Sequence, residues 1–369
     1  MKITCAKESL LEGINIVQKA VSTRSSVPIL EGILLTAGDR FKMTGYDMEM
    51  GIEAYVDAEI KKPGCIVINS KMFGEIVRKL SGDVTIEVKS NLKIEITSGA
   101  CSFEIKGLLA EQYPAFPEIE ESANFEIEQK VLKNMIKRTS FAVSVDQARQ
   151  ILTGVCIECK DGELTFAAID GFRMALRKNN IDFKEQIKAV VPAKTLNDMS
   201  KILTDEGKIN VSIEKSKIMF EMDNYKVISR LLEGEYLKYN SIIPKDFETT
   251  IKVNVKQILA SLERASLICA SENKKIPVNF DIGVDEIVIT SQAETGSAKE
   301  NVKAETAGNN MKICFNPKYL IDALNALKTP EDTEDTEVDI RFSSSIGPCT
   351  INPLEGNGYV YLVLPVKAN

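Results

Sequence analysis

The sequence predicts an α+β protein built from three copies of one domain. A segment of one pattern occurs three times, at residues 66–80, 189–203 and 313–327. In each copy an apolar, β-rich run meets a lysine and continues with apolar residues at helical intervals, which predicts a strand followed by a helix. Neighbouring copies are 123 and then 124 residues apart, about a third of the 369-residue chain, measured between Lys71, Lys194 and Lys318. This period predicts three domains, at 1–122, 123–248 and 249–369.

The helix that follows each lysine is predicted to have one apolar stripe and one basic side. In the first copy Phe73, Ile76 and Leu80 fall at i, i+3 and i+7, which puts them on one face. At about 100° per residue, Lys71 lies about 160° from the start of that stripe and Arg78 about 140°. One such lysine is typical of any surface helix. The same phase in three copies favours a basic surface formed by the helices.

Charge is divided unevenly along the chain. The net charge is −7, yet the six predicted helices together carry +8, which leaves −15 for the rest of the chain. These helices are 7–20, 70–80, 128–140, 193–203, 255–266 and 317–328. Basic helices on an acidic body indicate that the helices face a polyanion while the remaining surface repels it.

The sequence lacks the residues and motifs that several classes of enzyme require. There is no histidine, no GxxxxGK[ST] and no GxGxxG, so His-based catalysis and nucleotide hydrolysis have no visible machinery. Cys156 and Cys159 form a CxxC without a second pair, and we interpret the eight cysteines mostly as buried free thiols. We expect no metal, no cofactor and no catalytic residue. With no signal peptide and no apolar run long enough to span a bilayer, we expect a soluble, cytoplasmic protein without a membrane partner.

The elements of the first copy recur in the second. Helix 7–20, a polar turn, strands over 28–56, the lysine helix and a meander over 84–109 lead to a proline-rich acidic linker at 114–124. In the second copy ILTGVCI echoes ILEGILL, Asp170 follows Asp47 by 123 residues, and LLEGEY follows LLAEQY at the same interval. A second linker is expected around 240–250.

The third copy keeps the plan with two irregular segments. We expect 291–308 and the acidic segment 330–337 to be solvated loops, and 330–337 lacks the spacing of a calcium loop. The last strand, YVYLV, is apolar on both faces. Such a terminal strand needs a cover, or is itself a docking surface.

These motifs, in this order, resemble the bacterial DNA polymerase III β subunits, the sliding clamps. The resemblance covers the whole chain and rests on five segments: MKITCAKESLLEGINIVQKAVSTRSSVPIL, TGYDMEMG, AAIDGFRMA, FNPKYLIDALNALK and LVLPVK. It implies three DNA clamp domains, and a head-to-tail homodimer that forms a ring of six domains with helices around a central hole and antiparallel sheets outside. Such a ring would slide on double-stranded DNA without reading its sequence and would tether the polymerase.

Two sets of residues follow from the resemblance and the helix pattern together. The basic lining of the hole is expected to comprise Arg24, Lys71, Arg78, Lys130, Lys137, Arg149, Lys194, Lys201 and Lys318. The resemblance also implies a pocket for short peptide motifs carried by the polymerase α subunit, the clamp loader and other clamp-binding proteins. That pocket would comprise Leu152, Ile169, Gly171, Phe172, Arg173, Met174, Leu237, Ser241, Ile242, Asn316, Tyr319, Ile346, Pro348, Leu362, Leu364 and Val366.

The chain departs from the family pattern at both predicted protein-binding surfaces. Phe172 replaces a frequent histidine, Leu237 a common proline and Ser241 a frequent basic residue, which implies a different pocket shape. At the implied subunit interface Phe103 and Ile105 of one copy would meet Leu267 and Ile268 of the other. Ala100 and Ser102 replace arginines found there in some members.

Two other classes of function remain as alternatives. An enzyme could use Asp47 and Asp170 as carboxylates of a metal site, although aspartates beside strand-end turns usually cap those turns. A repeat scaffold could bind proteins alone.

Overall fold

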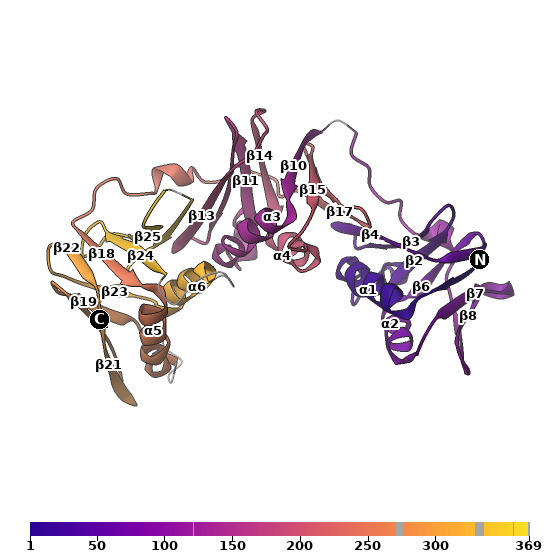
Figure 1. Cartoon of the computed structure of the whole chain (residues 1–369), viewed down its shortest axis with the longest axis horizontal. Helices are drawn as coiled ribbons and strands as arrows, with labels where there is room; N and C mark the ends of the chain where they lie inside the picture. Colours follow the sequence, from indigo (N-terminus) through magenta and orange to yellow (C-terminus); the bar gives the residue numbers. More distant parts are fainter. Residues whose placement is uncertain (121, 271–275, 329–335, 357, 368–369) are drawn as a thin grey trace. The chain divides into compact units, whose positions relative to one another are not determined.

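The computed structural model describes the whole chain except residues 121, 271–275, 329–335, 357 and 368–369 (Figure 1). Its contacts divide the chain into two compact units. The first unit comprises Met1–Lys130 with Lys201–Leu231, and the second comprises Val131–Ser200 with Leu232–Asn369. Each unit contains two antiparallel sheets and helices that pack against them. The α+β prediction is confirmed.

The first unit contains a sheet of eight strands in the order β10-β15-β16-β17-β4-β3-β2-β6. These are Ala123–Glu128, Lys208–Ile213, Lys217–Glu221, Tyr225–Arg230, Met50–Val56, Phe41–Tyr46, Gly32–Ala37 and Gly64–Asn69. Strand β17 pairs with β4, so strands from the first and second sequence repeats share one sheet. The second sheet has the order β5-β1-β7-β8-β9, with bounds Glu59–Lys62, Lys2–Cys5, Val84–Val88, Lys93–Ser98 and Cys101–Lys106.

Helices α1 (Lys7–Val17) and α2 (Ser70–Lys79) pack against each other in this unit. Each forms because its apolar residues make one stripe, which in α2 is the fully buried Phe73 and Val77. The Asn69 side chain caps α2 by accepting from the Met72 backbone N–H at 2.9 Å. Lys71 and Arg78 lie on the exposed side, as predicted.

The second unit contains a sheet of nine strands in the order β14-β11-β12-β13-β26-β25-β24-β18-β22. These are Ile187–Pro192, Gly154–Lys160, Glu163–Ile169, Arg173–Asn180, Tyr359–Val363, Cys349–Pro353, Glu337–Phe342, Thr249–Asn254 and Glu305–Gly308. A sheet of four has the order β21-β20-β19-β23, with bounds Gly296–Lys303, Glu286–Ala293, Val278–Ile282 and Met311–Phe315. The terminal strand β26 is therefore interior to the sheet, with β13 paired to one edge and β25 to the other.

Helices α5 (Val255–Ala270) and α6 (Pro317–Leu327) pack against each other in the second unit. Helices α3 (Gln129–Lys137) and α4 (Ala193–Ile202) are each shared by the two units in sequence. All six helices begin within two residues of their predicted starts. Helix α5 continues four residues past its predicted end at 266, and this places Leu267 and Ile268 on a helix.

The pairing of β13 with β26 defines two faces of the large sheet. Met174 pairs with Leu362 and Leu176 with Val360, so their side chains share one face. Arg173, Ala175 and Arg177 alternate with them and lie on the other face, together with their partners Val363, Tyr361 and Tyr359. The Phe141 ring, from the 3-10 turn Ser140–Ala142, packs edge-on against Tyr361 at 5.5 Å between centroids on that second face.

Three predictions need correction or restriction. Residues 291–308 are not a loop: β20, β21 and β22 occupy most of them, and β20 pairs with β21 along eight residues. The interpretation of the cysteines as mostly buried free thiols holds for five of the eight, while Cys65 and Cys101 are exposed. The predicted loop 330–337 lies mostly outside the described residues.

Among the described helices, none combines the length and the apolar character needed to cross a membrane.

Candidate docking pocket and basic surface

The turn between β12 and β13 is fixed by its first residue, Asp170. Its Oδ1 accepts hydrogen bonds from the backbone N–H groups of Phe172 at 2.8 Å and Arg173 at 3.0 Å. Gly171 has φ +96°, a left-handed conformation that favours glycine. Asp47 makes the same turn 123 residues earlier, accepting from Glu49 and Met50 at 3.0 and 2.7 Å. Both aspartates therefore cap turns, and the described residues contain no cluster of metal-ligating side chains.

Phe172 projects from this turn as an aromatic surface. Its side chain is 55% exposed, and its ring stacks on Tyr319 of α6 with 6.1 Å between centroids and 16° between planes. The Phe172 carbonyl accepts from the Leu364 backbone N–H at 2.9 Å. Three segments that are distant in sequence, the β12–β13 turn, α6 and the end of the chain, are thus joined at one place.

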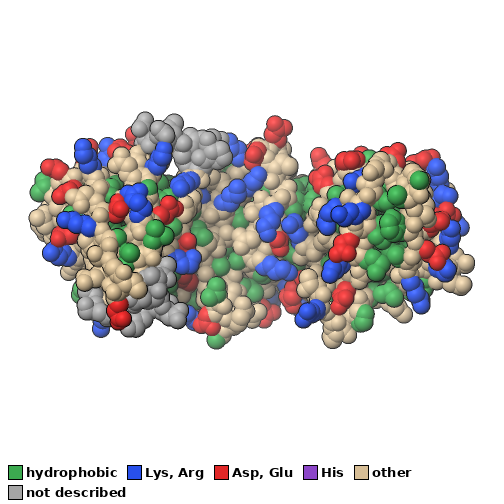
Figure 2. Space-filling view, turned by 90° about the horizontal axis from the view of Figure 1, so that it is seen from below, with side chains coloured by type: hydrophobic (Ala, Val, Ile, Leu, Met, Phe, Trp, Pro, Cys, Tyr) green, Lys and Arg blue, Asp and Glu red, His purple; other side chains and the backbone are tan. Residues whose placement is uncertain are grey.

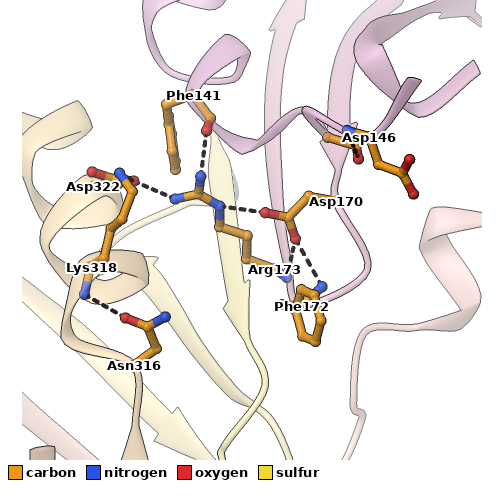
Figure 3. Close-up of polar contacts among 9 residues, drawn as sticks. Phe141, Asp146, Asp170, Phe172, Arg173, Asn316, Lys318 and Asp322 are labelled. Atoms are coloured by element: carbon orange, nitrogen blue, oxygen red, sulfur yellow. Dashed lines mark hydrogen bonds and ion pairs between the residues drawn. The ribbon is translucent and has the colours of Figure 1, made fainter. Parts of the chain in front are cut away.

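Arg173 lies behind that aromatic pair and is 8% exposed. Its Nε donates to Asp170 at 2.9 Å, one Nη to Asp322 of α6 at 2.6 Å, and the other to the Phe141 carbonyl at 2.8 Å (Figure 3). The guanidinium also lies 4.8 Å from the centre of the Tyr319 ring. A guanidinium with all three nitrogens engaged this way positions the turn and α6, so we assign Arg173 a supporting role in the pocket.

The start of α6 contributes two more of the predicted residues. Asn316 caps the helix by accepting from the Lys318 backbone N–H at 3.1 Å. The Lys318 ammonium lies 3.0 Å from the same Asp322 oxygen that receives Arg173 (Figure 3). Burial raises the pKa of Tyr319 first, and the nearby Asp170 carboxylate raises it further. Tyr319 is therefore a neutral ring with its hydroxyl retained at physiological pH.

An apolar cluster covers the first face of the nine-stranded sheet, opposite to the face that carries Arg173. Four of the predicted pocket residues belong to it and are at most 5% exposed: Leu152, Ile169, Met174 and Leu362. Leu364 packs against it while partly exposed. These side chains form the floor of the candidate pocket, so a ligand would touch few of their atoms.

The segment 236–243 crosses the same cluster and is held there by two tyrosines that the sequence did not single out. Tyr236 is 2% exposed and its hydroxyl donates to the Ala167 carbonyl at 3.2 Å. Tyr239 is 4% exposed and its hydroxyl lies 2.6 Å from the Glu158 carboxylate. Between and after them Leu237 and Ile242 are 45% and 39% exposed. The anchored segment thus presents apolar side chains to solvent beside a buried apolar floor.

The remaining pocket candidates differ in how firmly they are held. The Ser241 hydroxyl donates to its own loop, to the Lys238 carbonyl at 2.7 Å. Ile346 is 87% exposed in the β24–β25 connection, which also contains Pro348. Val366 is 37% exposed, and its backbone N–H donates to the Cys314 carbonyl at 2.9 Å.

Five residues that support the site were not predicted from the sequence: Phe141, Glu158, Tyr236, Tyr239 and Asp322. Of these, only Tyr236 lies in a segment that the sequence analysis had singled out, the repeated LLEGEY.

All nine predicted basic residues are exposed. In the first unit Lys71 and Arg78 line a groove of about 430 Å³ between α2 and the segment after α1, where the Gln18 amide donates to the Ser70 carbonyl at 2.8 Å. In the second unit Arg149 pairs with Asp146 at 3.2 Å and lies beside Gly171. A backbone hydrogen bond from Ala148, and then Arg149, lower the pKa of Asp146. Figure 2, which views the helices from below Figure 1, shows blue side chains gathered over the region of α3 and α4.

The four predicted interface residues lie on two exposed elements. Strand β9 is an edge of the five-stranded sheet, and its Phe103 is 40% exposed while Ile105 is partly exposed. On α5, Leu267 is 69% exposed and Ile268 is partly exposed. Large apolar side chains on an open strand edge and on a helix surface are features of a protein interface.

Comparison with known proteins places this geometry in a family. Three family models match in succession: the N-terminal, central and C-terminal domains of the DNA polymerase III β subunit, at residues 1–117, 126–238 and 240–367. The chain is 36% identical to the β sliding clamp of Bacillus subtilis and 34% to that of Halalkalibacterium halodurans, each covering all of both chains. The crystal structure of the B. subtilis clamp superposes on this chain with a TM-score of 0.94 at 36% sequence identity. The crystal structure of a β subunit from Thermotoga maritima superposes with a TM-score of 0.91 at 28% sequence identity, and both comparisons cover all of both chains.

Proposed function

From the membership of this chain in the DNA polymerase III β-subunit family, the sliding clamps, we propose that two copies close head to tail into a ring around duplex DNA. The chain is a processivity subunit with three clamp domains and is not catalytic. Two chains with three domains each give a ring of six, and we place the boundaries near 1–122, 123–248 and 249–369. We place the protein in the cytoplasm, where bacterial DNA is replicated.

The proposed interface joins β9 of one copy to α5 of the other. Phe103 and Ile105 would pack against Leu267 and Ile268, which buries side chains that the single chain leaves in water. An edge strand also offers unpaired backbone groups to a neighbouring strand. In this chain Ala100 and Ser102 lie beside Phe103, so apolar contact carries the interface between β9 and α5.

DNA would be held by enclosure, with weak contacts from the nine basic residues to phosphates. Phosphate contacts carry no sequence information, so they permit sliding along any sequence. Lys318 and Arg149 form ion pairs with carboxylates, which weakens the electrostatic attraction between these two side chains and a phosphate. A closed ring cannot leave DNA sideways, and a polymerase bound to it meets the primer end at a raised effective concentration.

The partners would bind the second unit through short extended peptides. The pocket would have Leu152, Ile169, Met174 and Leu362 as its floor and Phe172, Leu237 and Ile242 as its rim. Apolar walls with a few polar groups suit such a ligand. We propose the polymerase α subunit, the clamp loader and other proteins with a clamp-binding motif as occupants.

The full-length match to sliding clamps is the observation that carries this proposal. Its test is topological. Loaded on nicked circular DNA by a clamp loader, the protein should stay bound through gel filtration and should leave after the circle is cut. If the protein stays bound after the circle is cut, or is not retained on circular DNA at all, it is a scaffold that binds proteins alone.

The basic lining makes a separate prediction. Changing Lys71, Lys194 and Lys318 together to glutamate reverses three exposed charges, which should lower loading on DNA at least tenfold while the dimer stays intact. Loading assays and sedimentation measure the two properties. A matched variant with glutamate at Lys61, Lys215 and Lys312 carries the same charge change on strands and turns. If both variants load like the wild type, the lining assignment fails.

A further inference from the structure

The end of α3 and the second face of the nine-stranded sheet hold two half-buried arginines that have no acidic partner among the described residues. Arg177 and Tyr359 are paired residues of β13 and β26, so their side chains lie on one face. Arg138 follows α3, and its guanidinium lies 5.6 Å from the centre of the Tyr359 ring. Asn134 connects the two: its carbonyl accepts from the Arg138 backbone N–H at 3.0 Å, and its Oδ1 accepts from the Arg177 Nε at 3.4 Å.

Neither guanidinium forms an ion pair with any residue that the structure describes. Arg177 donates to the Gly358 carbonyl at 2.6 Å, a neutral acceptor. Burial lowers the pKa of Arg177, and the positive charge of Arg138 lowers it further. Two like charges that are close and partly withdrawn from water repel each other. An anion between them would remove that repulsion.

Two buried hydrogen-bond donors of this cluster have no partner among the described residues. The Arg138 Nε is buried and has no partner among the described residues. The Tyr361 hydroxyl also has none, although its side chain is 0% exposed. Tyr361 stacks on Tyr359 with 5.3 Å between centroids and interacts electrostatically with both arginines. A buried donor without a partner is destabilising because it has lost its hydrogen bonds to water, so a ligand that accepts from it is favoured.

We propose that Arg138, Arg177 and the Tyr361 hydroxyl form a binding site for one phosphate group. A tetrahedral oxyanion can accept from several directions at once, and guanidinium groups match it with paired N–H bonds. Both arginines are half-buried, which leaves one side open for entry. The phosphate can belong to a free anion or to a nucleic-acid backbone. Neither arginine is among the nine lining residues, and the site does not depend on the ring.

The first experiment is calorimetric titration of the full chain with inorganic phosphate at constant ionic strength. We expect a dissociation constant on the order of 1 mM. Arg138→Met and Arg177→Met should each weaken it at least tenfold, because each removes charge-assisted bonds. Tyr361→Phe should weaken it several-fold while the apolar core stays filled, which keeps the test valid if an arginine variant fails to fold. The control is Arg341→Met on β24, whose guanidinium pairs with Asp339 at 3.0 Å; it should bind phosphate like the wild type.

A second arm identifies the source of the phosphate. Binding of a duplex oligonucleotide is followed by anisotropy across salt concentrations. If the site takes a backbone phosphate, Arg138→Met lowers the slope of log K against log salt by about 1. If it takes a free anion, DNA binding is unchanged while phosphate binding is lost. The proposal is overturned if the wild type binds no phosphate, or if the three site variants bind it as well as Arg341→Met does.

Discussion

Phe103→Asp is expected to convert the dimer into monomers. The side chain is 40% exposed on the edge strand β9, and the proposed interface would bury it against Leu267. An unpaired carboxylate buried among apolar groups costs several kcal/mol, which raises the dissociation constant of the dimer about a thousandfold or more. Sedimentation equilibrium at micromolar concentration measures this directly. Loss of the dimer should also abolish retention on circular DNA.

The matched control for this variant lies on the other edge of the same sheet. Ile60→Asp introduces the same charge on β5, opposite to β9, and should leave the dimer intact. Circular dichroism should report a folded chain for both variants. A dimer of unchanged strength in Phe103→Asp would move the interface to another surface.

The helices were predictable from sequence because one physical pattern specifies them. Each apolar stripe recurs at helical intervals beside a lysine, and in the first and third copies an asparagine caps the start, Asn69 and Asn316. Helix α5 extends four residues past its predicted end, although Leu267, Ile268 and Cys269 are consecutive apolar residues and do not form a single helical stripe. Helix geometry turns these three to different sides, and only Cys269 is buried.

The hairpin of β20 and β21 was missed for the opposite reason. Strand β21 has one buried residue, Val302, and the other residues on its face toward α5, Gly296, Ala298 and Glu300, are only partly buried. An exposed strand needs no apolar alternation, so its sequence resembles a loop. Backbone pairing with β20, from Glu286 opposite Lys303 to Ala293 opposite Gly296, forms the strand instead.

The pocket could be predicted only through the family, because sheet register brings its residues together. Met174 and Leu362 are 188 residues apart and become neighbours when β13 pairs with β26. The same register places Arg173 on the opposite face, where Asp322 and Phe141 hold it. It also makes Leu362 a core residue, so deletion from residue 362 onward would destroy β26 and test folding more than docking.

An informative change to the pocket therefore leaves its floor intact and alters the rim. Leu237→Asp with Ile242→Asp places two carboxylates on a segment that Tyr236 and Tyr239 still anchor. Both positions are exposed, so folding should be little affected. A docked peptide would have to desolvate these charges, which should raise its dissociation constant at least a hundredfold and abolish polymerase stimulation. Fluorescence anisotropy of a labelled clamp-binding peptide and primer extension measure the two effects.

This prediction separates docking from the ring. The double variant should still form dimers and stay on nicked circular DNA, because the interface and the lining are untouched. Leu354→Asp, an apolar residue of similar exposure at 42%, is the control for adding a surface charge and should stimulate the polymerase normally. If the double variant binds peptide and stimulates the polymerase as the control does, partners dock elsewhere on the chain. If it loses retention on DNA as well, segment 236–243 supports the ring and the two functions share a structural element.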